Sequence, residues 1–217
     1  FEPERVAPGT WLYEKHPEWL LGRAGQDKLF FLGNPEGRRW MTDHVDTLLT
    51  EQGIDLYRQD HNFDPLAIWR ANDAKDRQGI TEIEHATGYL AYWDELRRRH
   101  PDMLIDSCAS GGRRNDLETL RRSVPLWRDD FVFEPTPMQN FTYGAALWIP
   151  YFGTGARDLD AYTFRSQMTP AIAFGVDIRR RDIDYGALRR LVDQWRSVAG
   201  NYYGDFYPLT RYNTEDD

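Results

Sequence analysis

The sequence has little cysteine and no excess of positive charge. Cys108 is the only cysteine in 217 residues, so a disulfide within the chain is impossible and a reducing compartment such as the cytoplasm is expected. The 27 lysine and arginine residues are outnumbered by 35 aspartate and glutamate residues, which gives a net charge of −8. Nucleic-acid-binding proteins concentrate positive charge to displace counterions, so this balance argues against a nucleic-acid partner.

Long apolar runs are also missing. No stretch approaches the roughly 18 apolar residues of a membrane span, and the start lacks the basic, apolar and small-residue pattern of a signal peptide. A soluble protein without a membrane partner is therefore expected. The chain starts on Phe1, directly inside the segment FEPE and with no strand before it. We therefore expect that residues upstream of Phe1 have been cut away.

Patterns for metal or cofactor binding are absent as well. None of the five histidines forms a short His-x-x-x-His pair of the kind that binds zinc. The segment SGGRRN at 110–115 lacks the spacing of a dinucleotide-binding loop, and no G-x-S-x-G nucleophile elbow occurs. We therefore expect neither a metal nor a cofactor.

What the sequence does contain is an alternation of short apolar runs with amphipathic stretches. Such alternation implies parallel strands joined by helical crossovers, so an α/β fold in a single domain over 1–217 is expected. Strands are expected at 28–33, 54–59, 103–107, 124–127 and 171–178, with another in or beside 143–153. Helices are expected at 34–53, 80–100, 111–123 and 185–204, and a long polar loop from about 60 to 79.

Helix 34–53 carries the clearest end signals. Asn34 is the expected N-cap, Pro35 stands at the first helical position, and Gly53 follows the last turn. Apolar side chains at helical spacing predict a buried stripe on this helix. Its members are Trp40, Val45, Leu48 and Leu49.

Polar residues follow directly after several expected strands. A closed (β/α)8 barrel places functional groups at the carboxyl ends of many strands, whereas an open doubly wound sheet gathers them in one crevice. The pattern therefore favours a TIM barrel. A complete barrel takes about 250 residues, so we expect an incomplete one that lacks its first strands. The polar groups are Asp60, the segment 106–112, Asp129 with Asp130, and Gly175 with Asp177.

Asp60 is the first candidate for chemistry. A carboxylate at the end of a buried strand loses hydration, which is tolerated when a donor such as Arg58 or a bound substrate stabilises it. The alternative is that Asp60 only caps the next loop. The aromatic and amide neighbours in YRQDHN favour a functional role.

Two further segments are candidates. In DSCASGGRRND (106–116), paired glycines allow a ligand close to the backbone, Arg113 or Arg114 offers a cation, and Cys108 is more consistent with a packed or ligand-lining thiol than with a nucleophile. In WRDD (127–130), adjacent carboxylates point to opposite sides, so one can act while the other makes structural contacts. Two solvated loop acids are the alternative.

Aromatic residues are abundant, with 8 tryptophans and 12 tyrosines. Aromatic faces stack on sugar rings, although most such residues pack in cores. The lining candidates are Trp11, Trp19, Trp127 and Tyr143, and the expected core residues are Trp40, Trp93 and Trp195.

The segments FEPERV, EKHPEWLL, LGNPE, IDLYRQDHN, DSCASGGRR and VPLWRDD occur in this order. In this the chain resembles family 36 glycoside hydrolases, the retaining α-galactosidases and their relatives, from the end of the third barrel strand to the eighth. The resemblance implies a (β/α)8 barrel and two-step hydrolysis of terminal α-linked galactosides. Asp60 would be the nucleophile and Asp130 the general acid/base.

Two positions depart from the family pattern. Arg58 stands where a lysine is usual, which keeps the charge and changes its reach. Asp129 stands where a serine is usual, and its charge would be expected to raise the pKa of Asp130, which suits an acid that must hold its proton. By the same resemblance, Cys108 and Gly111 would line the floor beneath the sugar. The expected substrate-binding residues are Arg58, Asn62, Cys108, Gly111, Arg113 and Trp127.

Alternatives stay open at this point. An α-N-acetylgalactosaminidase or a galactosyl-transferring relative would use the same machinery, and a non-catalytic sugar-binding module or inactive half-barrel would use none of it. An incomplete barrel exposes strand edges and apolar helix faces, which predicts a homo-oligomer.

Overall fold

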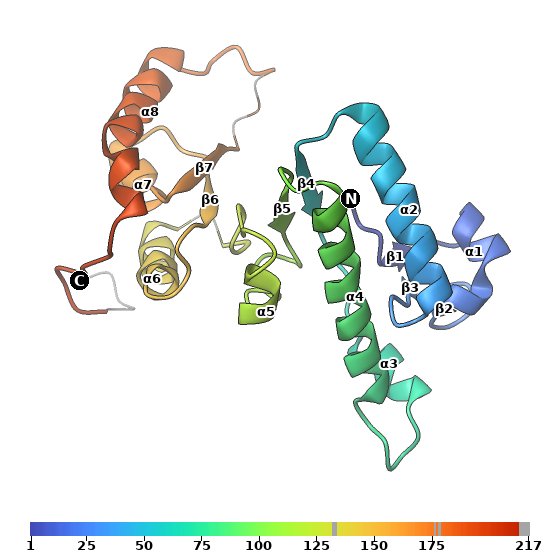
Figure 1. Ribbon diagram of the computed structural model, residues 1–217. Coiled ribbons are helices and arrows are strands. Elements are labelled where there is room, and N and C mark those ends of the chain that lie inside the picture. Colours follow the sequence, from blue (N-terminus) through green and yellow to red (C-terminus); the bar gives the residue numbers. More distant parts are fainter. Residues whose placement is uncertain (132–133, 176, 178, 213–217) are drawn as a thin grey trace. The chain divides into compact units, whose positions relative to one another are not determined.

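The computed structural model describes residues 1–131, 134–175, 177 and 179–212 (Figure 1). The chain divides into two compact units, one up to Ser123 and one from Val124 onward. The expected α/β organisation is confirmed, because helices alternate with strands and the pairs β4–β5 and β6–β7 are parallel.

The first unit is built around one parallel strand pair and two long helices. β4 and β5 pair in register, with Leu56 opposite Leu104 and Gln59 opposite Ser107. The elements of this unit are β1 (Arg5–Val6), α1 (Trp11–Lys15), the 3-10 helix η1 (Pro17–Trp19), β2 (Leu20–Leu21), β3 (Lys28–Phe30), α2 (Pro35–Gln52), β4 (Leu56–Gln59), α3 (Leu66–Asn72), α4 (Ile80–Arg99), β5 (Leu104–Ser107) and α5 (Leu117–Leu120).

The expected strand at 28–33 does not join a parallel sheet. β3 instead pairs antiparallel with β1 and β2, in the order β1-β3-β2. The reason is the short connection between β2 and β3, which turns through Gly22 and Gly25 with φ angles of 134° and 75°. A parallel crossover needs a dozen or more residues, so a link of this length permits only an antiparallel neighbour.

Helix α2 confirms the expected end signals. The Asn34 side chain accepts hydrogen bonds from the backbone N–H groups of Glu36 and Gly37, at 2.9 and 3.0 Å, and Gly53 adopts the left-handed conformation with φ 62°. Val45 and Leu49 are buried as expected. Leu48 was predicted wrongly, since it is 37% exposed. Met41, spaced four residues before Val45, completes the buried stripe instead.

The predictions of one loop and one helix were wrong. The expected polar loop from about 60 to 79 contains helix α3, and the helix expected within 111–123 shrinks to the four residues of α5. Helix α4 follows its prediction closely. Its start is fixed by Asp73, whose carboxylate accepts from the backbone N–H groups of Gly79 and Thr81, at 2.6 and 2.9 Å.

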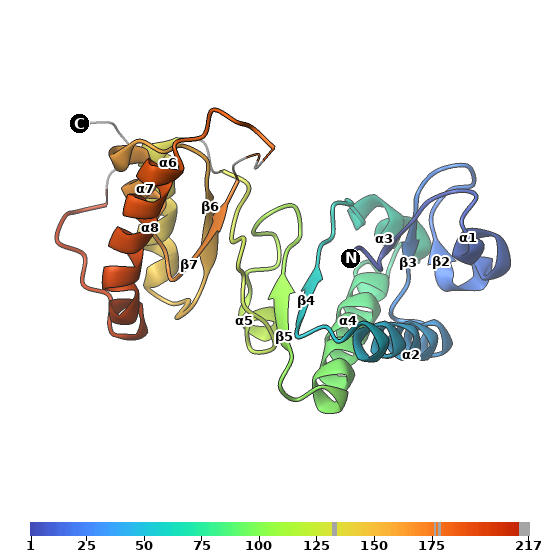
Figure 2. The ribbon, with the colours of Figure 1, turned by 90° about the horizontal axis from the view of Figure 1, so that it is seen from above.

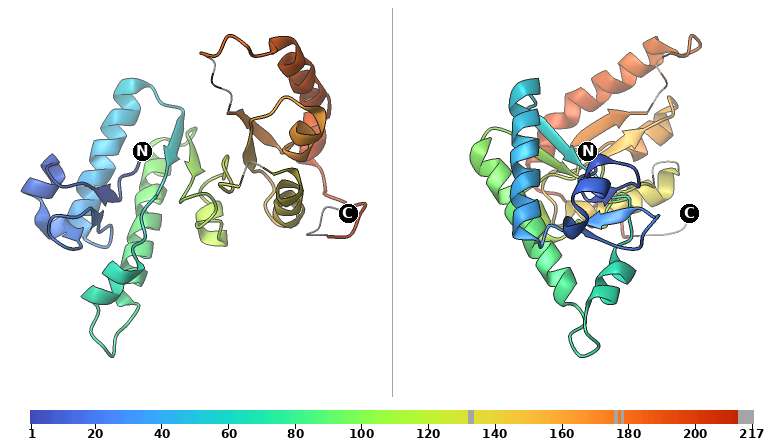
Figure 3. Two further views of the ribbon diagram at one scale, coloured as in Figure 1. Left: turned by 180° about the vertical axis from the view of Figure 1, so that it is seen from behind. Right: turned by 90° about the vertical axis from the view of Figure 1, so that its right-hand side faces the viewer.

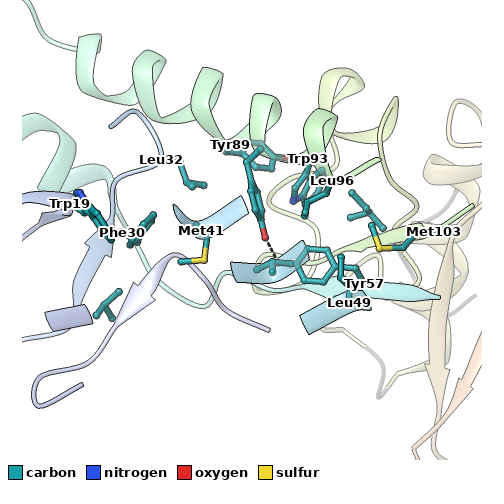
Figure 4. Packing of buried hydrophobic residues seen from close by; sticks show 14 of the residues in the cluster. Trp19, Phe30, Leu32, Met41, Leu49, Tyr57, Tyr89, Trp93, Leu96 and Met103 are labelled. Atoms are coloured by element: carbon teal, nitrogen blue, oxygen red, sulfur yellow. Dashed lines mark hydrogen bonds between the residues drawn. The ribbon is translucent and has the colours of Figure 1, made fainter. Parts of the chain in front are cut away.

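The core of the first unit lies between α2, α4 and strand β4 (Figure 4). Trp93 and Leu96 are fully buried in it, which confirms the core prediction for Trp93. Helix α4 approaches the chain after β3 so closely that a Cβ on Gly88 would lie 2.0 Å from the Leu32 carbonyl oxygen. Trp19, expected as a lining residue, belongs to this core, whereas Trp11 is 54% exposed.

The second unit has its own parallel pair, β6–β7, with Gly153 opposite Ala171. Figure 2 shows helix α8 running beside these strands, and Figure 3 shows the same unit from two further sides. Phe164, Leu191 and Trp195 contribute to its apolar cluster. The elements are α6 (Pro135–Ala146), β6 (Gly153–Ala156), α7 (Ala161–Ser166), β7 (Ala171–Phe174), α8 (Tyr185–Ala199) and the 3-10 helix η2 (Gly200–Tyr203).

The strand expected at 124–127 is not formed. Pro125 and Arg128 exchange backbone hydrogen bonds with Gly153, at 2.9 and 3.0 Å, but Pro125 has no N–H and cannot extend a ladder. Part of the segment 143–153 belongs to α6, and the strand beside it is β6. The last expected strand, at 171–178, is formed as β7 up to Phe174, and its positions 176 and 178 lie outside the described residues.

Candidate active site

Three chain segments run side by side where β4 and β5 end. The Phe1 backbone nitrogen donates to the Arg58 carbonyl at 3.0 Å, and the Asp60 N–H donates to the Phe1 carbonyl at 2.9 Å. This is the alternating pattern of a parallel ladder. The Cys108 N–H donates to the Gln59 carbonyl at 2.8 Å and continues the ladder on the other side. Asp60 therefore leaves β4 between two neighbours that hold its backbone.

The Asp60 carboxylate is partly buried and is held ionised by hydrogen bonds from its own loop and from the loop after β5. Its Oδ1 accepts from the His61 N–H at 2.8 Å and from the Ser110 N–H at 3.4 Å. Burial raises the pKa of Asp60, but hydrogen bonds from His61, Asn62, Cys108 and Ser110 outweigh burial and hold that pKa below its ordinary value. At neutral pH the group is a carboxylate, the form that a nucleophile needs.

Arg58 was expected to stabilise Asp60 directly, and the structure pairs it with another acid. Arg58 and Asp106 are register partners on β4 and β5, with Nη1 and Oδ2 separated by 2.5 Å. Side chains alternate along a strand, so Arg58 and Asp60 lie on the same side of β4. Arg58 therefore contributes positive charge near Asp60 while its hydrogen bond goes to the buried Asp106.

The loop after β5 forms a tight left-handed turn. Ser110 has a φ of 46° and Gly111 a φ of 76°, and the Ala109 N–H donates to the Gly111 carbonyl at 3.1 Å. Cys108, at the start of this turn, is buried. Burial raises the pKa of its thiol to about 11, and the thiol hydrogen-bonds to Asp60. Cys108 is thus a neutral thiol beside the carboxylate, in line with the packed or ligand-lining reading.

Arg113 ties the two loops together through its donors. Its Nη2 donates to the carbonyl oxygens of His61 and Phe63, each at 3.2 Å, and to Ser110 Oγ at 2.9 Å. Its Nε donates to the Ala109 carbonyl at 3.2 Å. The guanidinium was expected to bind substrate, and the contacts in this structure are with the loops that carry Asp60 and Ser110.

Asn62 is likewise held by protein groups. Its backbone N–H and its Nδ2 both donate to Glu2 Oε1, at 2.9 and 2.5 Å. Its Oδ1 accepts from Ser110 Oγ at 3.1 Å, and its side chain also hydrogen-bonds to Asp60. Glu2 was not predicted from the sequence, because an acidic residue beside Pro3 is expected to be exposed to solvent.

Glu4 is a second missed residue, and it lies at the centre of a buried polar network. Its carboxylate accepts from Gln59 Nε2 at 2.8 Å, from His85 Nε2 at 2.8 Å and from both terminal nitrogens of Arg114 at 2.6 and 2.7 Å. Burial opposes its charge, yet the Arg114 guanidinium and the hydrogen bonds hold the pKa of Glu4 well below its usual value.

His61, given no role from the sequence, belongs to the same network. Its Nδ1 accepts from Arg114 Nη2 at 2.9 Å, and burial lowers the pKa of its imidazole to about 4. Gln59 and His61 flank Asp60 in the chain, and both are connected to Glu4, the first directly and the second through Arg114. The network therefore fixes the residues immediately before and after Asp60.

The second acid candidate belongs to the second unit. Asp130 is exposed, and its Oδ1 accepts from Trp127 Nε1 at 3.0 Å. Asp129 accepts from Arg128 Nε and from the Phe131 N–H, both at 2.9 Å. The neighbouring acids therefore have different partners, and the charge of Asp129 faces a buried guanidinium.

Tyr143 lies on α6, partly buried, with edge contacts to Phe206 and Tyr212.

Among the described residues, no group of three or more histidine, cysteine, aspartate or glutamate side chains could hold a metal ion. No helix in the described part of the chain is both long and apolar enough to cross a membrane.

Comparison with curated proteins finds α-galactosidases. The chain is 26% identical over 157 residues to an α-galactosidase of Lactobacillus acidophilus, covering 69% of this chain and 21% of that protein. It is 28% identical over 162 residues to α-galactosidase C of Emericella nidulans, covering 71% and 20%. It is 30% identical over 140 residues to an α-galactosidase of Escherichia coli, covering 59% and 18%. The chain thus spans about a fifth of the length of these relatives.

Solved structures share the fold. The α-galactosidase AgaA of Geobacillus stearothermophilus, of glycoside hydrolase family 36, superposes with a TM-score of 0.76 at 20% identity, covering 91% of this chain and 30% of that one. An α-galactosidase of Lactobacillus brevis gives 0.79 at 18% identity, covering 94% and 30%. The family model described as Melibiase matches residues 1–160. Because this match covers most of the chain, the chain belongs to the melibiase family.

Proposed function

We propose that this chain forms part of the catalytic barrel of a retaining α-galactosidase. Asp60 would be the nucleophile and Asp130 the general acid/base. The observation that carries the proposal is the setting of Asp60. It is a carboxylate with a lowered pKa at the carboxyl end of a parallel strand, in a chain of the melibiase family. Barrel enzymes place their catalytic groups at such strand ends.

In the first step Asp60 attacks the anomeric carbon of the terminal galactose. The bond from that carbon to the leaving oxygen breaks, and Asp130 gives its proton to this oxygen. The product is a galactosyl ester on Asp60 with inverted configuration at the anomeric carbon. The loop donors around Asp60 keep it ionised before attack, which is the form that carries the electron pair.

In the second step a water molecule attacks the same carbon and releases Asp60. Asp130, now a carboxylate, takes the proton from that water, and the second inversion restores the original configuration. Trp127 donates to Asp130 Oδ1 and so fixes the orientation of this carboxyl group. Cys108, which hydrogen-bonds to Asp60, and Gly111, in the same loop after β5, would lie beneath the sugar.

This mechanism requires a barrel that joins the two units into one catalytic region over 1–217. Carboxylates of a retaining glycosidase stand about 5 to 5.5 Å apart. We propose that a (β/α)8 barrel brings Asp60 and Asp130 to that distance. A crystal structure of the protein with a galactose analogue tests this, and carboxylates on different surfaces would end the assignment.

We propose α-galactosyl oligosaccharides as substrates. Crystal structures of AgaA variants from Geobacillus stearothermophilus are in complex with stachyose and with raffinose, which supports this class. A homo-oligomer and a cytoplasmic location are part of the same proposal. The first rests on strand edges that an incomplete barrel would expose, and the second on the single cysteine.

Hydrolysis of p-nitrophenyl α-galactoside tests the activity. Adding azide as an external nucleophile distinguishes the role of Asp60 from that of Asp130. Asp60→Ala is expected to lose turnover and, with azide present, to form β-galactosyl azide by a single inversion. Asp130→Ala is expected to form α-galactosyl azide, because the ester on Asp60 still forms from this activated substrate and azide then replaces water. An inactive wild-type protein, or the opposite anomer from either variant, would overturn the proposal.

A further inference from the structure

Glu2 lies against the Asp60 loop without a role in the mechanism above. Its Oε1 accepts from both the backbone N–H and the side-chain Nδ2 of Asn62, and its other oxygen pairs with the Arg5 guanidinium. The Glu2 side chain is 19% exposed. Its carboxylate is thus held in place by two partners.

The contact with Glu2 fixes how the Asn62 amide is turned. Nδ2 faces the Glu2 carboxylate, so Oδ1 must face the Ser110 hydroxyl, which donates to it at 3.1 Å. Asn62 and Ser110 in turn both donate to Asp60, the first from its side chain and the second from its backbone N–H. Glu2 is therefore the outer end of a hydrogen-bond chain that leads through Asn62 to Asp60.

We propose that Glu2 is a positioning residue for Asp60 and that it acts through Asn62. The proposal deepens the function proposed above, because it takes Asp60 as the nucleophile. Glu2 touches no reacting atom. It keeps Asn62 turned so that a donor always faces the Asp60 carboxylate, and a freely rotating amide would present its oxygen to that carboxylate part of the time.

Replacing Glu2 also removes a negative charge, and this change acts in the opposite direction. A negative charge near Asp60 would raise its pKa, whereas the hydrogen bond from Asn62 lowers it. A matched pair of variants separates the two effects. Glu2→Gln keeps an acceptor oxygen for Asn62, Glu2→Leu has similar size without an acceptor, and both have lost the charge.

The first experiment measures the titration midpoint of Asp60 in the protein labelled with carboxyl-13C aspartate. The Asp60 resonance is assigned by its loss in Asp60→Asn. The midpoint is expected to be higher in Glu2→Leu than in Glu2→Gln, by about one unit. In the Asn62→Ala background the two variants are expected to agree. Equal midpoints in the wild-type background, or a difference that persists without Asn62, would overturn the proposal.

Kinetics provides the second readout. With a chromogenic α-galactoside, Glu2→Leu is expected to lose about tenfold in kcat with little change in KM, and the acidic limb of its kcat/KM profile is expected to lie at higher pH than that of Glu2→Gln. Glu2→Gln is expected to retain most activity, and Glu51→Ala, at an exposed position of α2, all of it. Equal activity of Glu2→Leu and Glu2→Gln would count against the proposal.

The two readouts fail separately. A wild-type protein without α-galactosidase activity would overturn the proposed function, while the midpoint of Asp60 would still report on Glu2. Should Glu2→Leu fail to fold, as judged by circular dichroism, Glu2→Ala replaces it in the same comparison.

Discussion

Arg58 and Asp106 stand opposite each other on β4 and β5, with Nη1 and Oδ2 2.5 Å apart. The Asp106 side chain is 5% exposed and that of Arg58 is 38% exposed. This ion pair links the two strands two residues before Asp60 on one chain segment and two residues before Cys108 on the other. It therefore fixes the register on which the distance between these two residues depends.

Removing Arg58 should cost stability as well as activity. Arg58→Ala takes the guanidinium from a buried carboxylate, and we expect a loss of about 3 kcal/mol in the free energy of unfolding by urea. Arg58→Lys keeps the charge and should lose about 1 kcal/mol, because a lysine cannot reproduce the guanidinium geometry. If Arg58→Ala and Arg58→Lys were equally stable, the ion pair with Asp106 would not be holding the strands.

Glu4 should make the first unit sensitive to acid. Its pKa is lowered in the folded state, so it contributes stability that is present above its unfolded pKa of about 4.3 and is lost as the pH falls toward its folded pKa. Glu4→Gln leaves the buried Arg114 without its carboxylate and should cost about 3 kcal/mol at pH 7. Urea unfolding should show this difference shrinking below about pH 4.3, and a constant difference would contradict the assignment.

His61 should add a second pH dependence, at higher pH. Its pKa is about 4 in the folded protein and about 6.5 when unfolded. The unfolded state therefore binds the proton first as the pH falls, and stability declines between pH 6.5 and 4 by up to about 3 kcal/mol. His61→Asn keeps an acceptor near the position of Nδ1 and should remove this decline. His44→Asn, at an exposed position of α2, should keep it.

The single thiol gives a direct test of the loop after β5. Cys108 is buried and its pKa is raised to about 11, so little thiolate exists at pH 8. Reaction with dithiobis-nitrobenzoate should be at least about a hundredfold slower in the folded protein than in urea. Any colour comes from Cys108 alone, since it is the only cysteine. Equal rates would mean that the turn is open.

Gly155 should be needed for the contact between Trp127 and Asp130. A Cβ at this position would lie 2.4 Å from the Trp127 ring, so Gly155→Ala must displace the indole that donates to Asp130. We expect kcat on an α-galactoside to fall about tenfold, in line with losing about 1.4 kcal/mol at the transition state. Gly144→Ala is the matched control. It lies in α6 with nothing within 4 Å, and it should raise stability by about 0.5 to 1 kcal/mol without changing kcat.

Local signals made part of this structure predictable. The ends of α2 follow from Asn34, Pro35 and Gly53, whose effects on the backbone act within a few residues. The same holds for β4, where an apolar run ends on Asp60. Leu48 shows the limit of the pattern, because helical spacing does not say which of two adjacent leucines faces the core.

The partners of the site residues could not be predicted in the same way. Asn62 is held by Glu2 from sixty positions away, and Arg58 by Asp106 from forty-eight. Such pairs depend on which strands become neighbours, and no local propensity encodes this. Glu4 was missed for a related reason, since a carboxylate is buried only when the surrounding fold supplies donors for both oxygens.

The φ of 46° at Ser110 restricts the sequences that this turn can accept. Left-handed backbone is costly for branched side chains and mild for glycine, asparagine and aspartate. Substitutions tolerated at position 110 should therefore be limited to a few small polar residues and glycine. Glycine would lack the hydroxyl that donates to Asn62. Libraries that vary the residues around Asp60 have little freedom at this position and would do better to vary positions whose backbone is extended.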